Sequence, residues 1–248
     1  MKIFEIFGLA RSGHHAIINW MIKNVCGYEA EMKWKLDLVN GKGVTYINEA
    51  NLDTEVTLKY INDQAPTTKF LFLSYENSEL DYSILNTEKK YFFPTSIDLE
   101  CIKNFHYNRR IIILRNFYNN LASRLKANQE NIVLSRDGEV LQWDVGQNFV
   151  DQWKNNAKNI LNNNFHGIKY EDWMVDKSKR NEFLNKVFGV DEFFDNKVLG
   201  THSSFGDIEN VNKRHKQIEI PNDIKELIKK DNELHYLMGK LGYEYLEI

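Results

Sequence analysis

The sequence predicts a three-layer α/β/α fold, in which helices cover both faces of a central parallel sheet of about five strands. Short apolar segments alternate with longer segments of helical period along the chain, a pattern typical of parallel sheets. The segments 70–73 and 111–114 are apolar at every position, as strands buried on both faces require. We therefore expect a single α/β domain over residues 1–248.

The strands of this sheet are expected at Lys2–Gly8, Gly43–Asn48, Lys69–Tyr75, Arg110–Leu114 and Gly167–Tyr170. Helices are expected at 14–25, 53–63, 97–106, 117–128 and 145–164. The last of these is the clearest, because Phe149, Trp153 and Ala157 recur at helical spacing.

Further along the chain, residues typical of helix starts and ends predict two more helices. Asp176 is a suitable N-cap for a helix that ends at Gly189, and Pro221 suits the first turn of a helix that continues to about Lys240. Residues 130–145 interrupt the alternation, and Asp137-Gly138 is typical of a turn between two short β-like pieces. We expect this segment to be an insertion over the sheet.

The turn after the first strand has the spacing of a phosphate-binding P-loop. Residues 8–15 read Gly-Leu-Ala-Arg-Ser-Gly-His-His, and a glycine-bounded turn before a helix cradles phosphate through backbone N–H groups. A nucleotide triphosphatase carries Lys and Ser/Thr where His14 and His15 stand. The sequence therefore indicates a P-loop type of fold with a phosphate site, in which the basic residue has moved into the loop as Arg11.

Composition excludes several classes of protein. The chain has 42% hydrophobic and 27% charged residues with a net charge of −3, which argues against general nucleic-acid binding. No apolar run approaches the length of about 18 residues that a membrane span needs. The first strand begins at Lys2, which leaves no room for a signal peptide. Because only Cys26 and Cys101 are present, we expect no disulfide framework and a cytoplasmic protein.

A second anion-binding motif follows the strand at 110–114. Arg115 stands at the tip of this buried strand, and Ser123 follows eight positions later, two helical turns on. A guanidinium fork and a hydroxyl at this spacing suit a second phosphate. Two more segments are expected at strand ends: Tyr170-Glu171-Asp172, and Ser203–Gly206 leading into Lys213–Lys216.

With these residues the chain resembles the PAPS-dependent sulfotransferases, whose donor is 3′-phosphoadenosine 5′-phosphosulfate. Gly8–Gly13 is similar to their first phosphate loop, Gly-x-x-Arg-Ser-Gly. Arg115-Asn116 with Ser123 resembles their second motif, although Phe117 replaces a proline. Tyr170-Glu171-Asp172 looks like their Tyr-Glu-Asp segment. Ser203 and Phe205 resemble a pair that borders the adenine, and Lys213 with Arg214 resembles a late basic phosphate loop.

The resemblance implies in-line transfer of a sulfuryl group from PAPS to an acceptor hydroxyl or amine, with no metal. Arg11 would contact the bridging or sulfuryl oxygens, and the backbone N–H groups of Ser12, Gly13, His14 and His15 would hold the 5′-phosphate. Arg115 and Ser123 would hold the 3′-phosphate. Tyr170 would lie near the adenine. We expect two anion pockets on one rim of the sheet, separated by the width of an adenosine.

The residue that activates the acceptor is less well defined. Family members use His or Glu as the base, and Glu76 follows a buried strand where such a base often stands. Glu49 is the rival, whereas His106 precedes a strand and falls on the wrong edge of a parallel sheet. The imidazoles of His14 and His15 can donate to phosphate or sulfuryl oxygens in place of the family's hydroxyls, and His14 is also a candidate for proton transfer.

Two other functions stay open at this point. One is a P-loop kinase of a small molecule, and the other is a non-catalytic nucleotide-binding scaffold. Local structural roles are also open: Arg115 as a strand-end arginine, Tyr170–Asp172 as a helix start, and Lys213–Lys216 as a solvated loop. The expected partner is a small-molecule or carbohydrate acceptor. The fold alone does not identify which acceptor is used.

Overall fold

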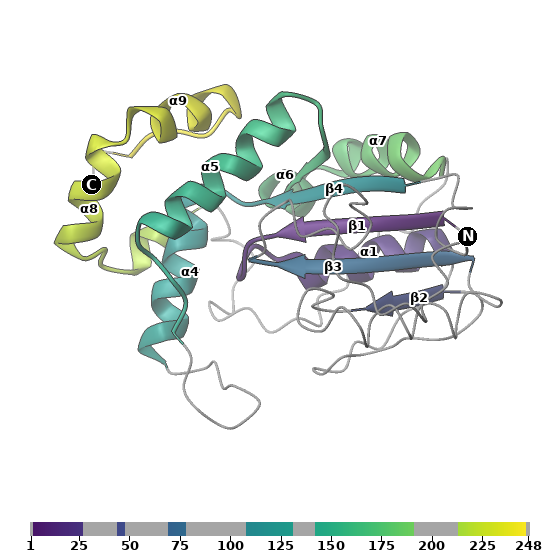
Figure 1. The fold of residues 1–248 in the computed structure, drawn as a ribbon, viewed down its shortest axis with the longest axis horizontal. Helices are drawn as coiled ribbons and strands as arrows, with labels where there is room; N and C mark the ends of the chain where they lie inside the picture. The colour runs from purple at the N-terminus through teal and green to yellow at the C-terminus, as the bar shows by residue number, and fades with distance from the viewer. Residues whose placement is uncertain are drawn as a thin grey trace, which may run out of the picture.

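The computed structural model describes residues 2–26, 44–47, 69–77, 108–130, 142–190 and 213–246. Within these ranges five strands form one sheet: β1 (Lys2–Gly8), β2 (Val44–Ile47), β3 (Phe70–Glu76), β4 (Asn108–Leu114) and β5 (His166–Lys169). Their order is β2-β3-β1-β4-β5 and every neighbouring pair is parallel (Figure 1). The prediction of a central parallel sheet of about five strands is confirmed.

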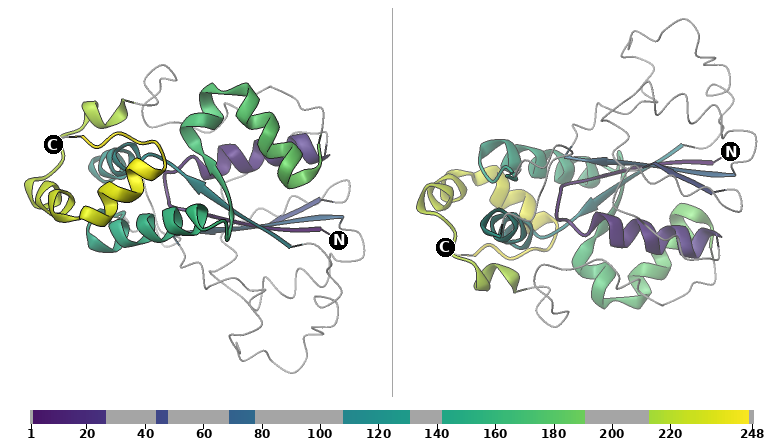
Figure 2. Two further views of the ribbon diagram at one scale, coloured as in Figure 1. Left: turned by 90° about the horizontal axis from the view of Figure 1, so that it is seen from above. Right: turned by 90° about the horizontal axis from the view of Figure 1, so that it is seen from below.

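Helices lie on both faces of this sheet. They are α1 (His14–Cys26), α4 (Phe117–Gln129), α5 (Gln147–Leu161), α6 (Tyr170–Val175), α7 (Lys177–Phe188), α8 (Asn222–Lys230) and α9 (Asn232–Lys240), with a 3₁₀ turn η2 (Arg214–Gln217). Figure 2 shows α1 and α7 on one face and α5 on the other, with α4, α8 and α9 beyond the carboxyl ends of the strands. Among the described residues, no helix has the length and apolarity that crossing a membrane requires.

Alternation along the strands divides the core into two halves. In β1, Ile3 and Phe7 belong to the cluster that contains the α5 side chains, whereas Phe4 and Ile6 belong to the cluster that contains the α1 side chains. All four are almost fully buried. Successive strand residues point to opposite faces, so apolar residues at alternating positions of one strand contribute to both halves of the core.

Several predicted boundaries agree with the structure. The Asp176 side chain accepts from the N–H of Lys179 as the N-cap of α7, and Gly189 ends that helix at a φ of 68°, in the left-handed region that favours glycine. The expected helices 53–63 and 97–106 and the turn at Asp137-Gly138 lie outside the described residues.

Two predicted elements are corrected. The helix expected from Pro221 to Lys240 is two helices, because the chain breaks at Asp231, whose side chain accepts from the N–H of Leu234 and begins α9. The strand expected at Gly167–Tyr170 ends at Lys169, and Tyr170 is the first residue of α6. The acidic residues Glu171 and Asp172 fall in the first turn of that helix, where negative charge interacts favourably with the positive end of the helix dipole.

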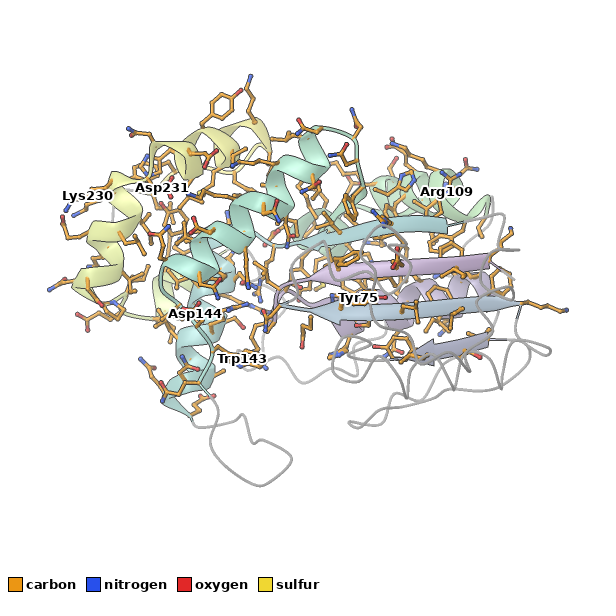
Figure 3. All side chains as sticks on the ribbon, viewed as in Figure 1. Tyr75, Arg109, Trp143, Asp144, Lys230 and Asp231 are labelled. Carbon is orange, nitrogen blue, oxygen red and sulfur yellow. The ribbon has the colours of Figure 1, made fainter. Side chains whose placement is uncertain are left out.

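Asp231 also joins α9 to α5 (Figure 3), and this joint gives a stability prediction. Its carboxylate lies 2.7 Å from Lys154 Nζ, with both side chains 12% exposed. We expect Asp231→Ala to lower the free energy of unfolding by about 2–3 kcal/mol, from a lost cap and a lost charged hydrogen bond. Asp231→Asn, which keeps the capping oxygen, should cost about half as much. Urea unfolding at pH 7 measures both.

The control for this prediction is Glu226→Ala, because Glu226 pairs with Lys229 and Lys230 on an exposed surface and should contribute under about 0.5 kcal/mol. Burial acts to raise the pKa of Asp231, but the hydrogen bond from Lys154 lowers it below the ordinary 3.8. The stabilisation is therefore present above that pH and lost as the pH falls through the folded-state pKa. A loss that does not change with pH contradicts the ion pair.

Candidate functional site

The loop between β1 and α1 has a backbone conformation that few residues adopt. Arg11 has a φ of 67° and Gly13 a φ of 84°, and the N–H of Ser12 donates to the carbonyl of Leu9 across a tight turn (3.0 Å). A Cβ at position 13 would lie 2.2 Å from the ring of Tyr170. Only glycine fits there, which explains the second glycine of the motif.

The backbone N–H of Ser12 takes part in the turn itself through its hydrogen bond to Leu9. The N–H groups that follow it lie in the first turn of α1, which begins at His14. Those of a first helical turn have no partner within the helix and carry its positive dipole end. The Ser12 hydroxyl is buried and has no hydrogen-bond partner in the part of the chain that is described.

Side chains from two other elements hold the loop from outside. Arg115 Nη1 donates to the carbonyl of Arg11 (2.7 Å), and Asn120 Nδ2 donates to the carbonyl of Ala10 (3.2 Å). The N–H of Ala10 donates in turn to Asn77 Oδ1 (2.8 Å). A loop with a non-glycine residue in the left-handed region persists only when its surroundings fix it, and these contacts supply that support.

Three arginines converge on this loop. Burial and then the like charge of Arg214 lower the pKa of Arg115 to about 10, and Arg11 acts in the same direction. Burial also lowers the pKa of Arg11, where Arg214 again adds to the effect and the charge of Glu76 works against it. Arg11 and Arg115 therefore both lie in a positive field to which Arg214 contributes, an arrangement that an anion would stabilise.

Arg115 is the most enclosed of the three. It is 3% exposed, its guanidinium carbon lies 4.9 Å from the centre of the Tyr170 ring, and its carbonyl accepts from Trp153 Nε1 (2.9 Å). Its Nε and Nη2 are buried without a hydrogen-bond partner among the described residues. Because unpartnered buried donors are costly, these two nitrogens mark a place for an acceptor. Arg115 also contacts the loop directly, through Nη1.

Glu171 fixes the chain next to Arg115. Both its carboxylate oxygens accept from the N–H of Asn116 (3.0 and 3.1 Å), and Oε2 accepts from the Tyr243 hydroxyl (3.2 Å). Burial raises the pKa of Glu171, and the charge of Arg115 opposes that rise. Phe117, which stands where the resemblance predicts a proline, packs instead against Phe149 and Trp153.

Arg214 reaches the site from the far end of the sequence. It begins η2, which packs on α4, where Asn119 Oδ1 accepts from the N–H of His215 (3.4 Å). Arg214 is 4% exposed, whereas the side chain of Lys213 is exposed to solvent. Of the two basic residues expected here, Arg214 is the buried one, and its charge acts on Arg11 and Arg115.

His14 lies beneath the loop. The residue is 2% exposed, Nε2 lies 2.7 Å from Ser74 Oγ, and a Cβ at Gly8 would lie 2.3 Å from Nδ1. Nδ1 has no hydrogen-bond partner within the described ranges. Burial and then the charge of His15 hold the pKa of His14 well below 6.5, and burial lowers that of His15. His14 is therefore neutral at pH 7.

Glu76 ends β3 directly opposite Gly8 in the parallel register, so it lies at the same edge as the loop. Its charge acts on the pKa of Arg11 and on that of Arg124. Ser123 is buried on α4. The other candidates, Glu49, His106, Ser203 and Phe205, lie outside the described residues. No group of three His, Cys, Asp or Glu side chains suited to a metal occurs among the residues that are described.

Sequence reasoning missed three side chains that shape the site, Asn77, Asn120 and Arg124, and it named Glu171 only as part of a motif, without its contact to Asn116. The available signal was a run of polar residues inside an otherwise buried helix, since Asn119, Asn120 and Arg124 are buried on α4. Buried polar side chains need partners, but the partners lie too far along the sequence to be identified from spacing.

Comparisons with known proteins agree with this architecture. No protein-family model and no curated protein matches the sequence. The sulfotransferase domain from the curacin biosynthetic pathway matches with a TM-score of 0.51 and 15% identity, over 99% of this chain and 99% of that chain. The sulfotransferase from Alicyclobacillus acidocaldarius matches with a TM-score of 0.51 and 11% identity, over 99% and 97%.

A third structure, mouse sulfotransferase SULT7A1 complexed with PAP, matches with a TM-score of 0.43 and 14% identity, over 94% of this chain and 74% of that chain. Identities this low carry information about architecture alone. The first two matches span nearly the whole of each chain, and by them this protein has the sulfotransferase fold.

Proposed function

We propose that the protein is a sulfotransferase that moves a sulfuryl group from PAPS to an acceptor hydroxyl or amine. The observation that carries the proposal is the convergence of Arg11, Arg115 and Arg214 on a glycine-bounded loop at the start of α1. PAPS carries a 5′-phosphosulfate and a separate 3′-phosphate, and three guanidinium groups beside a helix N-terminus match that distribution of negative charge.

The proposed binding roles follow from the unpartnered donors. The first turn of α1, with Gly13 and His15, would hold the 5′-phosphate, and the buried hydroxyl of Ser12 would add a donor. The 3′-phosphate would take up Nε and Nη2 of Arg115, together with Arg214 and Ser123; Lys213 would act only from a distance. Tyr170, Ser203 and Phe205 are proposed as neighbours of the adenine.

In the proposed reaction the acceptor oxygen or nitrogen forms a bond to sulfur while the bond from sulfur to the phosphate oxygen breaks. Arg11 would stabilise the charge that develops on the sulfuryl and bridging oxygens. Glu76 would receive the acceptor proton, and adenosine 3′,5′-bisphosphate would leave. Glu76 ends β3 opposite Gly8, and its charge acts on Arg11 and Arg124, so its position at the loop edge of the sheet supports its proposed role as the base.

His14 is proposed to act as a neutral neighbour of the transferring group. Its lowered pKa and its hydrogen bond to Ser74 suit an N–H donor in the floor of the loop better than a positive charge. The same observation weighs against a kinase, because a P-loop kinase carries a lysine at that position to stabilise the terminal phosphates.

A titration distinguishes the candidate functions. The wild-type protein should bind adenosine 3′,5′-bisphosphate more tightly than ATP with magnesium, in calorimetry at fixed salt. Tighter binding of ATP–magnesium would favour the kinase. Binding of the bisphosphate with no turnover, in a screen of small-molecule and carbohydrate acceptors with labelled PAPS, would favour the non-catalytic scaffold. The low cysteine count supports a reducing, cytoplasmic location.

A further inference from the structure

Asn77 is the residue that joins β3 to the phosphate loop. It follows β3 directly, and its N–H donates to the carbonyl of Gly8 (3.0 Å), which extends the pairing of β1 with β3 by one step. Its φ is 54°, a left-handed conformation that asparagine tolerates better than most residues. This turn directs the side chain back toward the loop rather than onward along the strand.

Two donors meet at one atom of this side chain. Asn77 Oδ1 accepts from the N–H of Ala10 (2.8 Å) and from Arg124 Nη2. Because both partners are obligatory donors, the atom between them must be the amide oxygen, which fixes the orientation of the amide. The N–H of Ala10 is therefore bound by Asn77 Oδ1, and the guanidinium of Arg124 fixes the position of that oxygen.

Arg124 is rigidly placed for this task. It is 1% exposed, its Nη1 donates to the carbonyl of Asp144 (2.7 Å), and its guanidinium carbon lies 4.5 Å from the centre of the Phe149 ring. Figure 3 shows Asp144 and Trp143 beside α4. Burial lowers the pKa of Arg124 to about 10, with the charges of Glu76 and Asp144 opposing, so it remains charged at pH 7.

From these contacts we infer that Asn77 is a positioning residue for the phosphate loop, held in its working orientation by Arg124. The inference rests on the proposed function, because it assigns the loop to the 5′-phosphate of the donor. Asn77 holds the N–H of Ala10 away from the anion and fixes the backbone just before Arg11. The loop is then ordered before the nucleotide arrives, and ordering done in advance does not subtract from affinity.

The first readout is amide hydrogen exchange at Ala10 in the free protein. Asn77→Gly removes the amide oxygen while accommodating the positive φ, and it should speed exchange at Ala10 by about 10-fold, the equivalent of one hydrogen bond. Asn77→Asp keeps an oxygen acceptor facing Arg124 and should restore protection. Unchanged protection in Asn77→Gly overturns the inference, whether or not the protein binds any nucleotide.

The second readout is affinity for two nucleotides. Asn77→Gly should weaken adenosine 3′,5′-bisphosphate and adenosine 5′-phosphosulfate by the same factor, about 5- to 20-fold, because both use the loop for the 5′-phosphate. A loss of loop protection with both affinities unchanged overturns the positioning role. If the wild-type protein binds neither nucleotide, the proposed function fails, and the bracing of the loop is then judged by the exchange result alone.

Gln152→Ala serves as the matched control. Gln152 Nε2 donates to the backbone carbonyl of Asn77 over 3.4 Å, so its removal alters the same turn and spares the Oδ1 bridge. It should leave both Ala10 exchange and nucleotide affinity within about twofold of wild type. Should Asn77→Gly fail to fold, Arg124→Lys replaces it, because lysine keeps the charge but lacks the planar fork. Faster exchange at Ala10 in Arg124→Lys supports the inference, and unchanged exchange overturns it.

Discussion

Replacing Arg115 with alanine should weaken adenosine 3′,5′-bisphosphate about 10- to 150-fold more than it weakens adenosine 5′-phosphosulfate, the range for a lost hydrogen bond to a charged group. The 3′-phosphate is proposed to use Nε and Nη2, which lack partners within the described ranges. Nη1 supports the loop and so serves both nucleotides alike. The ratio of the two dissociation constants therefore isolates the 3′-phosphate contact.

The control for Arg115→Ala is Arg109→Ala. Arg109 stands near the amino end of β4, at the opposite edge of the sheet (Figure 3), and its removal changes the net charge by the same amount. It should shift the affinities for both nucleotides by less than about twofold. Equal losses for the two nucleotides in Arg115→Ala would remove the 3′-phosphate from its proposed partner and leave Arg115 as a support of the loop.

The sheet was predictable from the sequence because its strands are apolar on both faces. Residues 111–114 have no polar position, and the structure buries all four within β4. The break at Asp231 was not predictable from periodicity, since Leu227 and Leu234, seven positions apart, continue the helical spacing across it. What decides the break is the cap at Asp231 and its ion pair with Lys154 on another helix, a tertiary contact that overrides local helical preference.

The site was predictable where chemistry is local to a motif. The Gly8–Gly13 spacing and Arg115 at a strand tip were read directly, and parallel strands guarantee that such ends meet at one edge. Within Lys213–Lys216, sequence alone did not distinguish the basic residue that turns inward from the one in solvent. The packing of η2 on α4 determines which basic residue is buried, and that residue is Arg214.

The supports of the site were not predictable, for the same reason in each case. Asn77 meets Ala10 across 67 positions and Asn120 meets the same residue across 110. Glu171 meets Asn116 across 55. Such side chains have no spacing rule, and their identity follows from the requirement that buried polar groups find partners once the fold has formed. His14 is similar, because Ser74 on β3 determines where its ring lies.

Replacing Arg11 with alanine should lower kcat for sulfuryl transfer about 100- to 1,000-fold, as expected for a lost donor to transition-state charge. The affinity for adenosine 3′,5′-bisphosphate should change by less than about threefold, because this product lacks the sulfuryl group that Arg11 is proposed to meet. Arg11 also lies in the positive field of Arg115 and Arg214. Its loss relieves that repulsion in the product complex, which offsets part of any lost attraction.

Single-turnover assays with labelled PAPS, run beside calorimetric titration of the bisphosphate, measure the two effects of Arg11→Ala separately. Alanine bears the same left-handed φ at position 11 as any residue with a Cβ, so backbone strain cancels in the comparison. Arg11→Lys keeps the charge and should recover part of the rate. If Arg11→Ala instead lowers the affinity for the bisphosphate about 100- to 1,000-fold and leaves kcat unchanged, Arg11 binds the nucleotide as Arg115 does. The charge that develops on the sulfuryl oxygens must then be met by another group.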